Sequence, residues 1–158
     1  MIDIRPATEN DLQQIMEFIR GLAEYEKLSH QCVATGPALR ETLFGPRRYA
    51  EVLIARLDDV PVGFALFFHN YSTFLAKPGI YLEDVFVLPE HRGEGVGKAL
   101  LKSVAQIAKD RDCGRLEWSV LDWNKSAIQF YERIGATVMD DWRICRMTRA
   151  QINLLLES

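Results

Sequence analysis

The spacing of apolar residues changes along the chain between every second position and every third or fourth, and each spacing predicts one kind of element. Near the start, apolar and charged residues alternate over residues 2–5, which predicts a short strand that ends at Pro6. Apolar residues at helical spacing follow over residues 12–23, and Thr8 with Asp11 has the form of a capping box at the start of this helix. The chain therefore opens with a strand and an amphipathic helix.

The rest of the chain contains further strand-like and helix-like segments. Strands are expected over residues 51–57, 62–68, 80–88 and 116–121 and around Val138 and Ile144, and helices around Leu39 and Leu43, over residues 98–110 and over residues 126–134. Asp58 and Asp59 join the first two of these strands into an antiparallel hairpin. A hairpin followed by alternating strands and helices predicts an α/β fold, with a mixed sheet and helices on both faces.

Length and composition favour one domain over residues 1–158. With 158 residues, of which 48% are hydrophobic and 26% are charged, the chain can bury a core without disulfide or metal scaffolding. The net charge of −3 provides no basic field for nucleic acid or an anionic membrane. Apolar stretches such as residues 62–68 are shorter than the roughly 20 residues that span a bilayer, and residues 1–5 lack a secretory signal pattern. We therefore expect a cytoplasmic protein with no nucleic-acid or membrane partner.

The cysteines and histidines do not have the pattern of a metal site. Cys32, Cys113 and Cys145 are odd in number, widely spaced and in no CxxC pair, and the three histidines are equally scattered. Zinc sites need ligands at short, regular spacings, and disulfide frameworks need paired cysteines. We therefore expect neither a metal nor a disulfide.

The segment between the strand over residues 80–88 and the helix over residues 98–110 carries the strongest chemical signal. It reads His91-Arg92-Gly93-Glu94-Gly95-Val96-Gly97-Lys98. Three alternate glycines let the main chain approach a ligand closely, and the following helix offers unpaired N–H groups and the positive end of its dipole to phosphate. The spacing excludes the Walker loop, because Gly93 and Gly97 enclose three residues instead of four. It also excludes the dinucleotide fingerprint, whose last glycine would fall on Lys98.

With two other segments, this R-G-x-G-x-G loop resembles the GCN5-related N-acetyltransferase superfamily. The strand over residues 81–87 precedes the loop, and residues 123–127 (W-N-K-S-A) and 130–136 (F-Y-E-R-I-G-A) match the superfamily's second signature. Within the superfamily, the chain is most similar to the diamine (spermidine/spermine) acetyltransferases and their thialysine-acetylating relatives. The segments that carry this likeness are I-R-P-A-T at 4–8, L-A-E-Y-E at 22–26, Y-L-E-D at 81–84 and W-R at 142–143.

The resemblance implies a twisted, mostly antiparallel sheet in a single domain, acetyl-CoA as the co-substrate and a small-molecule amine as the acceptor. It also implies a homodimer in which C-terminal strands and tail are exchanged or packed across the interface. The apolar end over residues 152–156 is compatible with such a dimer, and equally with a helix packed on its own subunit.

The same resemblance implies which residues bind coenzyme A. They are the main-chain groups of Val85, Phe86 and Val87, the loop residues Arg92, Gly93, Glu94, Gly95, Val96, Gly97 and Lys98, and Asn124, Lys125, Ser126, Ala127 and Tyr131. Main-chain donors of this kind can stabilise an oxyanion. For Asn124, the alternative is a helix cap alone, because asparagine is favourable there.

Acetyl transfer to an amine needs a proton acceptor for the ammonium and a proton donor for the thiolate. Glu83, in a strand expected to be largely buried, matches the family's proton acceptor, and its alternative is to bind the cationic substrate. Tyr131 matches the tyrosine that protonates the thiolate, since a phenol near pKa 10 can donate to it. The alternative for Tyr131 is an aromatic core residue beside Phe130.

The acceptor site is expected to be acidic. Its candidate residues are Tyr25, Glu26, Glu83, Asp84, Glu117, Asp140 and Trp142. The family's polyamine enzymes carry an acidic residue and a tryptophan where this chain has residues 71–74 (Y-S-T-F), and a histidine where it has Glu117. A shorter diamine or an amino-acid-like amine therefore fits at least as well as a long polyamine. The alternatives are a protein or peptide N-acetyltransferase and a non-catalytic coenzyme A-binding module.

Overall fold

The computed structural model describes residues 1–158, and the chain divides into two compact units, Met1–Ser119 and Val120–Ser158. Each unit is described by itself, and the single domain expected over the whole chain stays a prediction. None of the helices combines the length and the apolar composition that crossing a bilayer requires.

The first unit is built on a five-stranded sheet. Its strands are β1 (Ile2–Pro6), β2 (Glu51–Leu57), β3 (Val60–Ser72), β4 (Lys77–Val87) and β5 (Leu116–Glu117), and its helices are α1 (Leu12–Tyr25), α2 (Gly36–Phe44) and α3 (Val96–Asp110). The strands lie side by side in chain order, the first four antiparallel and β5 parallel to β4. The expected mixed, mostly antiparallel sheet is confirmed.

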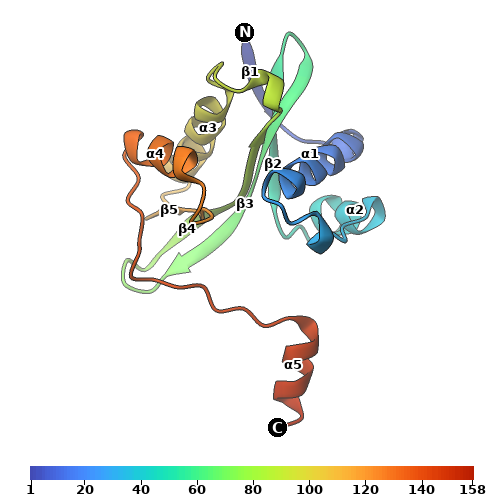
Figure 1. Ribbon diagram of the computed structural model, residues 1–158, viewed down its shortest axis with the longest axis vertical. Coiled ribbons are helices and arrows are strands. Elements are labelled where there is room, and N and C mark those ends of the chain that lie inside the picture. Colours follow the sequence, from blue (N-terminus) through green and yellow to red (C-terminus); the bar gives the residue numbers. More distant parts are fainter. The chain divides into compact units, whose positions relative to one another are not determined.

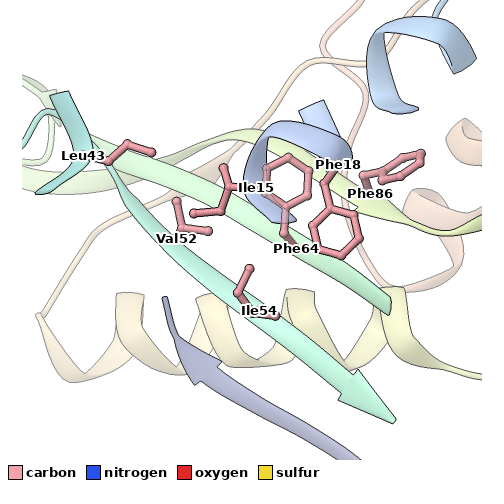
Figure 2. Close-up of a cluster of buried hydrophobic side chains, with 7 residues drawn as sticks. All are labelled: Ile15, Phe18, Leu43, Val52, Ile54, Phe64 and Phe86. Carbon is pink, nitrogen blue, oxygen red and sulfur yellow. The ribbon is translucent and has the colours of Figure 1, made fainter. Parts of the chain in front are cut away.

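Helices cover both faces of this sheet, with α1 and α2 on one face and α3 on the other (Figure 1). Apolar side chains fill the space between α1, α2 and the sheet (Figure 2). They are Ile15, Phe18, Leu43, Val52, Ile54, Phe64 and Phe86. The rings of Phe18 and Phe64 stack at 5.5 Å between centroids, and each fully buried side chain of this size stabilises the fold by about 1.5–3 kcal/mol.

α1 begins at Leu12, as the spacing of apolar residues predicts. The main-chain N–H of Thr8 donates to the Asp11 carboxylate at 2.8 Å just before α1, which confirms this part of the capping box. The carboxylate of Asp11 also pairs with the partly buried Arg56 of β2 at 2.9 Å. The start of α1 is therefore tied to the sheet.

A β-bulge interrupts the pairing of β3 with β4. Leu66 lies opposite Asp84, but the next residue of β3, Phe67, lies opposite Leu82. Glu83 is therefore an extra residue in β4. Two residues on one strand oppose one on the other, so the alternation of β4 shifts by one position after Leu82.

The second unit contains the helices α4 (Lys125–Arg133) and α5 (Arg149–Leu156) and no strand. The predicted strands around Val138 and Ile144 are wrong, and the predicted strand over residues 116–121 is reduced to Leu116–Glu117. The alternation in these segments is real, but a strand also requires a neighbour to pair with, and alternation does not supply one. The helix expected over residues 126–134 is confirmed within one residue at each end.

Candidate active site

An open strand edge lies beside β5. Ile80 is paired with Leu116 and Tyr81 with Glu117, and no further pair of the two strands follows. β4 nevertheless continues to Val87. From Leu82 onward, no strand pairs with this edge of β4, so its main-chain N–H groups are not used in the sheet.

The bulge determines which main-chain groups point to this open edge. Before it, the N–H of Ile80 points toward β5 and donates to the carbonyl of Arg115 at 3.0 Å. After it, the N–H of Leu88 points the other way and donates to Val62 at 2.8 Å. Because main-chain groups alternate along a strand, Val85 and Val87 direct theirs to the open edge.

The glycine loop joins the end of β4 to α3. Gly93 and Gly95 have φ angles of +82° and +86°, a left-handed conformation that strongly favours glycine. Gly95 is the N-cap of α3, and Val96 is buried at its first turn. The unpaired N–H groups of this turn and the helix dipole favour an anionic group such as phosphate.

The conformation of Gly95, and not the space around it, makes this position sensitive to substitution, because a Cβ there would meet no atom within 4 Å. Gly95→Ala is expected to cost about 1 kcal/mol in the left-handed region and to raise the dissociation constant of coenzyme A about fivefold or more. Gly36→Ala is the matched control, since Gly36 also has open space but no positive φ. Calorimetric titration of coenzyme A into each variant measures the two dissociation constants. Equal dissociation constants for Gly95→Ala and Gly36→Ala would contradict the expectation.

Three carboxylates gather where α1 ends over β4. Burial, then the charges of Glu83 and Glu26, raises the pKa of Asp84 to about 7. Burial and the charge of Glu83 likewise raise the pKa of Glu26. The expectation that Glu83 is largely buried is wrong: its side chain is exposed, because it is the extra residue of the bulge. The cluster disfavours its own negative charge and would be stabilised by a cation.

Arg92 makes contacts that its place in the glycine loop does not predict. Its Nε donates to the carbonyl of Val87 at 3.1 Å. Its guanidinium lies 4.6 Å from the ring centroid of Tyr25 and 5.6 Å from that of Phe86. Arg92 thus links the loop, the end of β4 and the last turn of α1.

Glu117 is held by a neighbouring side chain. Its Oε1 accepts a solvent-exposed hydrogen bond from Nδ2 of Asn70 at 3.1 Å. Nearby, the hydroxyl of Tyr81 lies 2.6 Å from that of Ser119. These groups line the point where β4 and β5 part, and they add polar character to it.

The other candidate residues lie in the second unit. Asn124 caps α4 by accepting from the N–H of Ala127 at 3.3 Å, so its helix-capping role is present. The ring of Tyr131 packs on that of Phe130 at 5.7 Å, and Asp140 and Trp142 are exposed. The roles of these residues in binding and catalysis stay predictions.

No group of three or more histidine, cysteine, aspartate or glutamate side chains has an arrangement suited to a metal ion. The site offers a turn suited to phosphate, an open strand edge and a carboxylate cluster. The first two features suit a phosphate-bearing thioester, and the third suits an amine.

Comparisons with known proteins agree with this chemistry. The family model described as Acetyltransferase (GNAT) family matches residues 13–136. A thialysine N-epsilon-acetyltransferase from Bos taurus is 41% identical, over 90% of each chain, and an L-ornithine N5-acetyltransferase from Arabidopsis thaliana is 36% identical, over 92% of this chain and 83% of the other. An integron cassette protein from the mobile metagenome of V. cholerae has a similar structure, with a TM-score of 0.82 and 26% identity over 99% of this chain and 98% of the other. The chain belongs to the acetyltransferase (GNAT) family, which uses acetyl-CoA as co-substrate, and it is an N-acetyltransferase.

Proposed function

We propose that the protein acetylates the primary amine of a small cationic molecule, a short diamine or an amino acid with an amine side chain. The observation that carries the proposal is the cluster of Glu26, Glu83 and Asp84, whose charges act on one another. A protonated amine placed among them relieves their mutual repulsion. The names of the relatives, which act on ornithine and thialysine, support an acceptor of this size.

The amine must lose a proton before it can attack. A lysine-like amine has a reference pKa of about 10.4, so only on the order of one molecule in 10³ is neutral at pH 7. In the proposal, Glu83 accepts this proton directly or through water. Its exposure supports the role, because an exposed carboxylate can pass the proton on to solvent.

The neutral amine then forms a bond to the carbonyl carbon of the acetyl thioester, and the bond between that carbon and sulfur breaks. The N–H groups of Val85 and Val87 at the open edge of β4 are proposed to stabilise the negative charge on the carbonyl oxygen. Tyr131 is proposed to donate its hydroxyl proton to the departing thiolate, and the second proton of the attacking nitrogen, passed on through water, restores that hydroxyl. The products are the acetylated amine and free coenzyme A.

A thiol-release assay tests the proposal. Acetyl-CoA is incubated with the protein and with ornithine, thialysine, lysine, putrescine, spermidine or a short peptide, and free thiol is measured with 5,5′-dithiobis(nitrobenzoate). We expect release with one or more of the first four amines and a lower kcat/KM with spermidine and the peptide. Preference for the peptide would contradict the acceptor class. Binding of coenzyme A without turnover of any amine would favour a binding module.

A further inference from the structure

Arg92 belongs to the glycine loop in sequence, yet its guanidinium contacts the acceptor side of the site. Its Nε–H is used by the carbonyl of Val87, and its planar head lies over the ring of Tyr25 at 4.6 Å. A guanidinium at this distance from an aromatic ring is attracted by the negative face of the ring. The ring of Phe86 lies on the same guanidinium at 5.6 Å.

Phe86 also packs against the end of α1, the segment that Arg92 contacts through Tyr25. A Cβ at Gly21 would lie 2.9 Å from the Phe86 ring, so α1 rests directly on this ring one turn before Tyr25. α1 ends at Tyr25, and Glu26 follows as its C-cap. Gly21 on Phe86 and Tyr25 on Arg92 are thus two consecutive contacts that fix the end of α1 over β4.

We propose that Arg92 is a positioning residue for the amine. By holding the ring of Tyr25, Arg92 directs the carboxylate of the next residue, Glu26, toward Glu83 and Asp84. This inference rests on the proposed function, because it assigns Arg92 to the acceptor side of that site. It goes beyond the expectation that Arg92 binds the coenzyme pyrophosphate, because it assigns a role to the contacts that the guanidinium makes with Val87 and Tyr25.

The geometry of the contacts requires arginine. Only a planar guanidinium donates through Nε along its stem while its face covers a ring, whereas lysine carries a compact charge without this geometry. Arg92→Lys therefore keeps the positive charge of the loop and removes the positioning. Arg47→Lys is the matched control, because Arg47 lies over the exposed ring of Tyr49 at 5.0 Å, outside the site.

The test measures the KM of both substrates in a double-mutant cycle of Arg92→Lys and Tyr25→Leu. We expect each single variant to raise the KM of the amine about tenfold and the double variant to raise it no further. The dissociation constant of coenzyme A should change less than twofold in Arg92→Lys, and Arg47→Lys should change neither value. A raised dissociation constant for coenzyme A with an unchanged amine KM would overturn the proposal, as would additive effects in the cycle.

A direct binding measurement separates this inference from the proposed function. Calorimetry of amine binding to the coenzyme A complex needs no turnover, and absence of binding by every amine tested with wild-type protein would mean that the proposed function has failed. In that case thermal unfolding of the wild type, the two single variants and the double variant of the cycle still tests the contact between Arg92 and Tyr25. Non-additive shifts in Tm would support the contact with Tyr25, and additive shifts would overturn it.

Discussion

Tyr131→Phe is expected to lower the kcat of acetyl transfer by about 10²- to 10³-fold, because it removes the hydroxyl proposed to protonate the departing thiolate. The ring remains, so its packing on Phe130 is retained. The KM of acetyl-CoA should change little. Steady-state thiol release with the preferred amine measures both constants.

Tyr49→Phe is the control for this variant. It removes the same hydroxyl from an exposed tyrosine that lies beside Arg47, outside the site. We expect its kcat to equal that of the wild type. If Tyr131→Phe also retains more than about half of the wild-type kcat, another group or water protonates the thiolate, and the role assigned to Tyr131 is wrong.

Asp84→Asn is expected to make the protein more stable at pH 8. The folded protein raises the pKa of Asp84 from 3.8 to about 7, so between these values it binds more protons at this site than the unfolded chain does. The free energy of unfolding of the wild type therefore falls as pH rises from about 4 to about 7 and is constant above. The full shift in the pKa of Asp84 lowers the free energy of unfolding of the wild type by at most about 4 kcal/mol. Asp84→Asn avoids this loss, because asparagine does not ionise.

Urea unfolding of the wild type and Asp84→Asn at pH 5, 6, 7 and 8 measures this difference. Subtraction of the two curves removes groups common to both, such as Glu51, whose pKa is lowered by its hydrogen bond to Arg111. Glu83→Gln, next to Asp84 but exposed, is the control, and its gain in stability at pH 8 should be much smaller. A pH-independent difference for Asp84→Asn would show that burial does not raise the pKa of Asp84.

Periodicity in the sequence predicted the helices of the first unit and the antiparallel hairpin of β2 and β3, whereas the mostly antiparallel sheet was expected from the family resemblance. Residues such as Ile15, Leu43 and Phe64 are buried where their spacing placed them, because one face of each element must be covered. The strands around Val138 and Ile144 were predicted wrongly, since pairing depends on a partner that no local pattern contains. The homodimer expected from the resemblance stays a prediction for a related reason.

Parts of the site were visible in the sequence, and parts depend on contacts between distant residues. Gly95 could be predicted, because its place between a strand and a helix already indicates a phosphate-binding turn. The contact of Arg92 with Tyr25 could not, because 67 positions separate the two residues in the sequence. Gly21 gave a weak signal, a glycine inside an amphipathic helix, which often marks close packing against another element.

The extra residue in β4 can be removed without changing the register on either side of it. If Glu83 were deleted, Leu82 would still lie opposite Phe67 and Asp84 opposite Leu66, so the bulge would close into regular pairing. Phe86 would stay opposite Phe64 on the α1 side of the sheet, and the main-chain groups of Val85 and Val87 would stay at the open edge. A deletion of one codon here would therefore remove an exposed carboxylate and leave the core face and the reactive edge in place. For engineering, Glu83 is a position where this strand can lose a residue without losing its register.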